Sequence, residues 1–444
     1  MDRSKKVLAA FVLLGAWLAV PSLAQFGFHA ADPGPRTGPA GAGGPLAGLD
    51  PAILPFFLSG FQNFIEVESV TGSIAGTGAG LGPRFNLDSC AGCHAQPTLG
   101  GSSPALNPEI AVATRLGATN QVPFFIQADG PIREARFVLN PDGSPDGMVH
   151  ELFTIAGRSD APGCTLAQPD FEEQAREHNL AFRIPTPLFG AGLVENIPDS
   201  AILANQHADA ERKAELGIHG HPNRSANDGT ITRFGWKAQN KSILLFCGEA
   251  YNVEMGVANE LFPQERDETE GCVLNPTPED ITNFSVAAPT GVPSDIEQFA
   301  FFVRFLAPPE PAASTPETLR GRRVFDQVGC SLCHTPSLDT GATSVQALSR
   351  QSAALYSDLL VHHMGQALAD RITQGSAGPD EFRTAPLWGV GQRIFFLHDG
   401  RARDVLAAIL AHQSSGSEAG RVVVNFNALS EQDKQAVLDF LRSL

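Results

Sequence analysis

The sequence predicts a mainly α-helical protein made of two related domains, with loop-rich insertions and short β segments in the first. Two observations carry this prediction. The pentapeptide C-x-x-C-H occurs at 90–94 and again at 330–334, and further segments recur in the same order after each copy. Apolar residues at helical spacing also flank both copies, at 51–64, 294–306 and 430–444.

Residues 1–24 have the three parts of a secretory signal peptide. Arg3, Lys5 and Lys6 form a basic start, residues 7–20 form an apolar run, and 22–24 is a small-residue cleavage site. The apolar run is shorter than the roughly 20 residues that span a bilayer. We therefore expect cleavage, a periplasmic or secreted mature protein, and no membrane span after cleavage.

Residues 25–48 are rich in Gly, Ala and Pro, which predicts a flexible linker. An N-terminal domain is expected over 49–312. It opens with a predicted helix over 51–64 that carries four Phe residues, and short β-like runs such as 135–139 follow the first C-x-x-C-H copy. Its last helix starts at a capping box over 294–297.

The proline-rich stretch 308–316 predicts the boundary to a C-terminal domain over 313–444. Thr315 is an N-cap with Pro316 at the first helical position, and Ser430 opens a last helix with an apolar stripe that ends at Leu444. Helices placed on both sides of a C-x-x-C-H copy are typical of a small cytochrome c domain.

C-x-x-C-H is the attachment motif of a c-type haem, so the two copies predict two covalently bound haem groups. Two thiols one helical turn apart add to the two vinyl groups of one porphyrin, and the adjacent His reaches the iron. The four thiols are Cys90, Cys93, Cys330 and Cys333. A C-x-x-C pair alone could be a redox disulfide or half of a zinc site, but His94 and His334 follow the two pairs.

The remaining three cysteines indicate which thiols are free or paired, and the net charge limits the kinds of binding partner. Cys247 lies in an apolar run and predicts a buried thiol, whereas Cys164 and Cys272 each follow a Gly in a polar loop and could form a disulfide. The formal charge of −17 argues against nucleic acid and anionic membrane surfaces as partners. A basic redox partner fits this charge, although an acidic surface also serves solubility.

The repeat extends beyond the haem motif. Residues 182–192 match 382–391, with one extra residue in the first copy, and 236–239 then aligns with 398–401. A short helical segment follows in both halves. Three matching pieces in the same order predict a duplicated cytochrome domain.

With these motifs the chain resembles the bacterial di-haem cytochrome c peroxidase superfamily, specifically its di-haem oxidoreductase branch, whose peroxidase-like members were once called thiol oxidoreductases. The resemblance implies two mostly helical c-type domains, of which the C-terminal haem passes electrons and the N-terminal haem does the chemistry. Some relatives also bind Ca²⁺ between domains, although no motif here places it. The segments that carry the resemblance are Gly82-Pro83-Arg84-Phe85-Asn86, Phe234-Gly235-Trp236-Lys237-Ala238, Ser357-Asp358-Leu359-Leu360, Met364-Gly365, Thr384-Ala385-Pro386-Leu387-Trp388-Gly389 and Leu397-His398-Asp399-Gly400-Arg401-Ala402.

His94 and His334 are the expected proximal ligands. In the superfamily the C-terminal haem takes its sixth ligand fourteen residues after the position of His398, which here is His412. A bis-His haem has a lower potential than the His/Met haem of the peroxidases. Three rivals for this position stay open, and they are His362, His363 and Met364.

The same offset in the first half leads to Ala250, which cannot bind iron, and no His occurs over 95–149 to close that haem from the loop. The N-terminal iron is therefore expected to be open to peroxide or dioxygen. The peroxidases of the superfamily carry a Glu-Gln pair on the distal helix, where this chain has Leu245 and Phe246, so an apolar distal pocket is one expectation. Glu249 and Glu254 are the candidates to replace the lost acid–base group, or else they are solvated helix residues.

Trp236 occupies the position where the superfamily has a Trp between the haems, which makes it a candidate electron relay or a packed core residue. The favoured function is a periplasmic di-haem peroxidase that reduces hydrogen peroxide or an organic peroxide with electrons from a small cytochrome c or a cupredoxin. The alternatives are a non-catalytic electron carrier and an oxygenase that uses dioxygen on an apolar substrate. The oligomeric state is not readable from the sequence.

Overall fold

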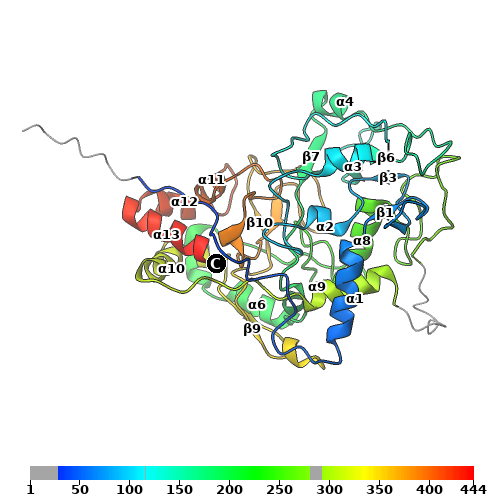
Figure 1. The fold of residues 1–444 in the computed structure, drawn as a ribbon. Helices are drawn as coiled ribbons and strands as arrows, with labels where there is room; N and C mark the ends of the chain where they lie inside the picture. The colour runs from blue at the N-terminus through cyan, green and yellow to red at the C-terminus, as the bar shows by residue number, and fades with distance from the viewer. Residues whose placement is uncertain (1–28, 116, 281–292) are drawn as a thin grey trace, which may run out of the picture.

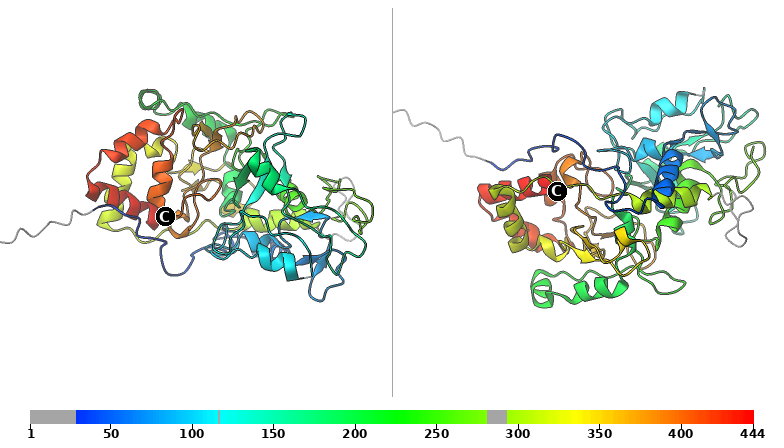
Figure 2. Two further views of the ribbon diagram at one scale, coloured as in Figure 1. Left: turned by 90° about the horizontal axis from the view of Figure 1, so that it is seen from above. Right: turned by 60° about the horizontal axis from the view of Figure 1, so that its bottom comes forward.

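The computed structural model describes residues 29–115, 117–280 and 293–444, and the expected signal peptide over 1–24 lies outside them. The described chain is mainly helical, with five small β-sheets of two or three strands, as the sequence predicted. The helices α10, α12 and α13 gather at one end of the molecule and α1, α8 and α9 at the other (Figures 1 and 2). None of the described helices is long and apolar enough to cross a membrane.

The helices are α1 (Leu54–Ile65), α2 (Cys90–Cys93), α3 (Glu109–Arg115), α4 (Phe171–Arg176), α5 (Ala191–Glu195), α6 (Asp199–His207), α7 (Ala210–Leu216), α8 (Ile243–Met255), α9 (Asp295–Phe305), α10 (Pro316–Val328), α11 (Val405–Ala411), α12 (Gly420–Asn427) and α13 (Glu431–Ser443), with short 3-10 turns at Cys330–Leu332, Gln346–Leu348 and Val390–Gln392. The strands pair as β1 (Glu68–Ser69) with β2 (Gly78–Ala79), β3 (Arg84–Phe85) with β6 (Phe153–Thr154), β8 (Leu338–Asp339) with β9 (Ser352–Ala353) and β10 (Val361–His363) with β11 (Glu381–Arg383), while β4 (Glu134–Phe137) lies between β5 (Val149–His150) and β7 (Leu180–Arg183).

The predicted Phe-rich helix and the predicted capping-box helix are α1 and α9, and they pack against each other. Gly60 allows the close approach, because a Cβ there would lie 2.1 Å from the carbonyl oxygen of Gln298. Phe57 and Phe64 are buried against Phe302, whereas Phe56 stays 45% exposed. The first haem motif, on α2, follows α1 in the chain and precedes α9.

The C-terminal helices repeat this arrangement. Thr315 caps α10 and Ser430 caps α13, as the sequence predicted. Gly321 lets the two helices touch, because a Cβ at this position would lie 1.8 Å from the carbonyl oxygen of Ala436. Val437, Phe440 and Leu441 form the buried stripe of α13.

The described part of the Gly/Ala/Pro-rich segment is largely exposed, and it is anchored to the rest of the chain at particular contacts. Asp32 forms two hydrogen bonds of 2.6–2.7 Å with the guanidinium of Arg442 on α13, and both side chains are almost fully buried. The backbone N–H of Leu46 donates to the carbonyl of Phe305. These partners lie hundreds of residues away in the sequence, so local composition could not indicate them.

Cys164 and Cys272 form a disulfide, which confirms the possible pairing, and Cys247 is a buried thiol as predicted. The bond joins two loop regions 108 residues apart in the N-terminal half.

The segments that match in sequence also share local geometry. The first pair begins in the last residues of β7 and β11. The second pair forms a turn closed by an isolated bridge, Phe234 with Asn240 in one half and Phe396 with Ala402 in the other. A capped helix follows each turn, because Ser242 caps α8 and Asp404 caps α11. Positive φ values occur at matching positions, in the pairs Gly190 and Gly389, Gly235 and Leu397, and Ala238 and Gly400.

The two turns also contact each other's strands. The N–H of Arg383 donates to the carbonyl of Trp236, at 2.8 Å, and the N–H of Ile184 donates to the carbonyl of His398, at 2.7 Å. The turn of each half is thus fixed to the strand region of the other half, between the two C-x-x-C-H motifs.

Candidate functional site

The first C-x-x-C-H motif forms part of the wall of a cavity of about 1170 Å³, part of which is open to solvent. The short helix α2 places Cys90, Cys93 and His94 together on this wall. Neither sulfur is in a disulfide. The three groups that one haem c needs from the motif therefore meet at one cavity of sufficient size.

The His94 imidazole is held in an orientation suited to a metal ligand. Its Nδ1 lies 2.9 Å from the carbonyl oxygen of Gly101, and its ring packs 6.1 Å from the ring of Phe64. A hydrogen bond at Nδ1 fixes the tautomer and leaves Nε2 for the metal. Burial lowers the pKa of His94 to about 4, so the imidazole is neutral, as ligation requires.

The helix α8 forms another wall of this cavity. Phe246, Glu249, Ala250 and Glu254 line the cavity, and Leu245 is not among the lining residues. The wall is mainly apolar, as one expectation had it, and the carboxyl groups of Glu249 and Glu254 lie among the apolar side chains. Ala250 does line the cavity, so the position that matches His412 in the repeat offers no ligand atom.

Glu254 forms a buried carboxyl pair with Glu134 of β4. The two side chains are hydrogen-bonded to each other, and Asn86 Nδ2 donates to Glu254 Oε2 at 2.6 Å. Burial raises the pKa of Glu254 well above its usual range, and the neighbouring Glu134 raises it further. Burial also opposes ionisation of Glu134, but the Arg136 guanidinium, 2.6 Å away, outweighs it and lowers that pKa. These opposite directions make Glu254 the carboxyl group of the pair that is more easily protonated.

Glu249 and Glu109 are further carboxyl groups of the cavity wall. Asn240 Nδ2 donates to Glu249 Oε2. Glu109 is fully buried and accepts a 2.6 Å hydrogen bond from Asn107, while its Oε1 has no hydrogen-bond partner in the described part of the chain. Burial raises the pKa of Glu109 to about 8, so this group is also protonated at neutral pH.

The second motif lines a cavity of about 1440 Å³, together with His412. His334 Nδ1 lies 3.0 Å from the carbonyl oxygen of Tyr356, and His412 Nδ1 lies 2.7 Å from that of Ala408. Burial lowers the pKa of His334 to about 4, and the nearby His412 lowers it further. Burial also lowers the pKa of His412. Two neutral imidazoles that line one cavity, each with Nε2 left for a metal, are the groups that a bis-His haem needs.

The three rivals of His412 differ in their surroundings. His362 is bonded at both ring nitrogens, to Asp358 and Glu418, so it has no nitrogen left for iron. The His363 side chain is half-exposed, pairs with Asp380 and does not line the cavity. Met364 does line it, so His412 and Met364 remain the two groups that could reach the iron.

The buried guanidinium of Arg393 indicates whether the lining of the second cavity is compatible with a haem. Its side chain lines the cavity and is buried, yet Nε and Nη2 have no hydrogen-bond partner among the described residues. Burial lowers the pKa of this guanidinium to about 10. A buried unpaired cation is costly, and a haem propionate would supply the missing anion. The donor set therefore fits the group that the motif predicts.

Trp236 lines both cavities. Its indole N–H donates to the carbonyl of Ile184 at 2.8 Å, which fixes the ring between the two C-x-x-C-H sites. Trp388 lines neither cavity. The sequence-based preference for Trp236 thus agrees with the position of its side chain.

Sequence reasoning did not find Glu134, Glu109 or Arg393. Each lies far in the sequence from the motifs and belongs to no recognisable pattern of its own. The available signal was chemical, because Glu134 and Arg136 alternate along a predicted β run and so present two opposite charges on one face of the strand.

The chain has been compared with known proteins, and no match was found among the curated proteins. Among solved structures, a hydrazine synthase of Kuenenia stuttgartiensis is 18% identical with a TM-score of 0.23, and the match covers 34% of this chain and 56% of that chain. A MauG-like protein associated with microbial copper homeostasis is 17% identical with a TM-score of 0.24, covering 34% and 52%. The diheme peroxidase BthA from Burkholderia thailandensis E264 is 15% identical with a TM-score of 0.29, covering 59% and 86%.

These low scores indicate a distant likeness, and the match spans little more than half of the first two proteins. A family model described as "Di-haem oxidoreductase, putative peroxidase" matches residues 117–444, about three quarters of the chain. The match includes the second C-x-x-C-H motif, and the first motif lies before it. The chain therefore belongs to the di-haem oxidoreductase family of enzymes.

Proposed function

We propose that this enzyme is a periplasmic peroxidase that reduces hydrogen peroxide or an organic peroxide at its N-terminal haem, with electrons that enter at its C-terminal haem. The observation that carries the proposal is the difference between matching positions of the repeat. His412 lines the C-terminal cavity, whereas Ala250 and the carboxyl pair of Glu134 and Glu254 line the N-terminal cavity.

The chain's own residues would hold both groups. Cys90 and Cys93 would form thioethers to one haem, with His94 as the proximal ligand. Cys330 and Cys333 would bind the other, with His334 and His412 as the residues that would hold its iron and Arg393 as a cationic partner for a propionate. The haem irons supply the redox chemistry, and the protein positions substrate and protons around them.

The N-terminal cavity suits peroxide because it combines space with proton donors. His94 is the one imidazole among the described residues that line it. Reduction of a peroxide needs protons for the oxygen atoms that leave as water or alcohol. We assign the donor role to Glu254, since Glu134 keeps its proton in place and Asn86 fixes its direction. Glu249 is the second candidate on the same helix.

Trp236 would relay electrons between the two sites, since its ring lines both cavities and its N–H is fixed to Ile184. The carboxyl groups of the cavity wall favour peroxide over the alternative of an apolar substrate attacked with dioxygen. A pure electron carrier would need a ligand at the sixth position of both irons, and Ala250 does not offer one.

We also infer that the halves 49–312 and 313–444 are duplicated haem domains. The shared turn, capped helix and backbone conformation at matching positions support this. The signal peptide and the Cys164–Cys272 disulfide favour the periplasm, where a small cytochrome c or cupredoxin would donate electrons.

Low-temperature EPR of the ferric protein, before and after addition of hydrogen peroxide, tests the proposal. We expect one high-spin and one low-spin haem, with the high-spin signal consumed by peroxide. Two matched variants assign the signals, because Ala250→His should close the N-terminal iron and His412→Ala should open the C-terminal one. Two low-spin haems that ignore peroxide in the native protein would exclude the open site.

A further inference from the structure

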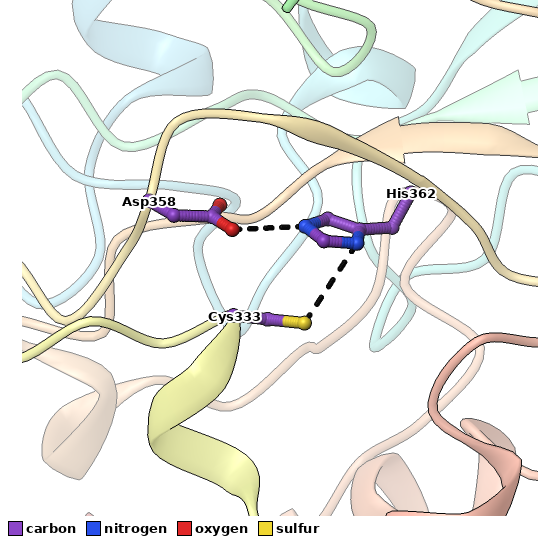
Figure 3. A group of neighbouring side chains, drawn as sticks. All are labelled: Cys333, Asp358 and His362. Carbon is purple, nitrogen blue, oxygen red and sulfur yellow. Dashed lines mark hydrogen bonds and ion pairs between the residues drawn. The ribbon is translucent and has the colours of Figure 1, made fainter. Parts of the chain in front are cut away.

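His362 lies in a buried group of charges beside the second haem motif (Figure 3). Its Nε2 is 2.9 Å from Asp358 Oδ2 and its Nδ1 is 2.8 Å from Glu418 Oε2. The Nδ1 atom also lies 3.8 Å from the sulfur of Cys333. All three charged side chains are at least nine-tenths buried, so this group is shielded from solvent.

Both ring nitrogens of His362 face carboxylate oxygens. An ionised carboxylate only accepts hydrogen bonds, so both nitrogens must donate and the ring must be an imidazolium. Backbone N–H groups also donate to both carboxylates, from Leu360 to Asp358, and from His219 and His363 to Glu418.

This cation faces the edge of the C-terminal haem site. His362 and Glu418 both line that cavity, and the Cys333 sulfur would join the porphyrin. Gly220 covers the ring closely, because a Cβ at this position would lie 2.1 Å from His362 Cε1. Charges act over a longer range in such an enclosed site than in water, since the effective dielectric constant is lower.

We propose that the buried group of Asp358, His362 and Glu418 tunes the reduction potential of the C-terminal haem. The His362 imidazolium offsets one of the two carboxylates that flank it, and so keeps this potential higher than the carboxylates alone would. One added electron is stabilised by an adjacent cation and destabilised by an adjacent anion. The proposal rests on the proposed attachment of haem at Cys330 and Cys333. His362 is a positioning residue in this role, because it acts through the charge that it holds beside the haem.

Spectroscopic redox titration of the full-length di-haem protein tests the inference, with the N-terminal haem as internal reference. We expect His362→Gln to shift the one-electron equilibrium of the C-terminal haem at least tenfold toward the oxidised form, about 59 mV. Glu418→Gln removes an anion from the same group and should shift it toward the reduced form. His363→Gln is the matched control, since this neighbouring His is half-exposed and does not line the cavity.

Opposite shifts in the two variants cannot come from a general loosening of the site, which would move both potentials in the same direction. Shifts of the same sign, or two potentials within twofold of the native equilibrium, would overturn the inference. If His362→Gln does not fold, Glu418→Gln alone decides, and an absent or negative shift refutes the role. A chain that carries fewer than two covalent haems by mass would instead refute the proposed function.

Discussion

Replacement of Glu254 by Gln removes the proposed proton donor while it keeps the shape of the side chain. The amide oxygen of the new side chain can still accept the hydrogen bond from Asn86, which is 2.6 Å in the native protein. General acid catalysis contributes about 10²–10⁴-fold, so we expect the second-order rate constant with hydrogen peroxide to fall by about that factor. Each factor of ten corresponds to about 1.4 kcal/mol of transition-state free energy, which gives about 3–5 kcal/mol.

Glu134→Gln should act differently, because Glu134 does not deliver the proton in this scheme. Its carboxylate helps to hold the pKa of Glu254 above the usual range, after burial itself. Without that carboxylate the pKa of Glu254 falls, so Glu254 loses its proton at a lower pH. We expect a rate that is close to native at low pH and drops earlier than the native rate as the pH rises.

Stopped-flow measurement of the high-spin haem band after mixing with peroxide, from pH 5 to pH 9, separates the two roles. The fully reduced and the half-reduced protein should be tested alike, since either could be the reactive form. Glu249→Gln serves as the matched control from the same helix. A Glu254→Gln rate within threefold of native across this pH range, or a larger loss in Glu249→Gln, would refute the assignment.

Three further changes test other parts of the site. Trp236→Phe should slow electron transfer from the C-terminal to the N-terminal haem at least about tenfold, whereas the control Trp388→Phe should not. Rapid-mixing spectroscopy measures both rates. Equal rates in the two variants would show that Trp236 is not an electron relay. Arg393→Gln should lower the unfolding free energy of the haem-loaded protein by about 1.5–3 kcal/mol, the worth of a charge-assisted hydrogen bond, with partial recovery in Arg393→Lys; an unchanged urea midpoint would contradict the propionate contact. Burial raises the Glu109 pKa to about 8, so the folded state keeps a proton that the unfolded chain releases above about pH 4.5, and stability falls as the pH rises between these values. Glu109→Gln should remove this dependence and gain up to about 5 kcal/mol at pH 8 relative to native, and a pH-dependence equal to that of the native protein in urea unfolding would show that Glu109 titrates normally.

Much of the helical framework could be predicted from the sequence, because its signals are local. Ser294, Thr315 and Ser430 each precede a helix and accept a hydrogen bond from its first turn. Such caps depend on a few consecutive residues, so they can be predicted without knowledge of the tertiary structure. The position of His412 was likewise readable, since a fixed offset from the turn at His398 places it on the cavity wall.

Other features depend on contacts between distant segments. The composition of 25–48 predicted a linker because no local pattern reveals that Asp32 pairs with Arg442. Similarly, the substitution of Leu245 and Phe246 for polar residues predicted an apolar pocket. The carboxylate of Glu134, which faces Glu254 in the cavity, comes from strand β4, more than a hundred residues before Leu245 in the chain. Tertiary structure brings these groups together, and only their charge pattern was visible beforehand.

The ion pair between Asp32 and Arg442 joins residues 410 positions apart. This contact closes one of the longest loops in the described chain, so its loop-closure entropy is among the largest that folding has to overcome. The pair ties the segment around Asp32 to α13. A chain without α13 should therefore leave this segment more open to proteolysis.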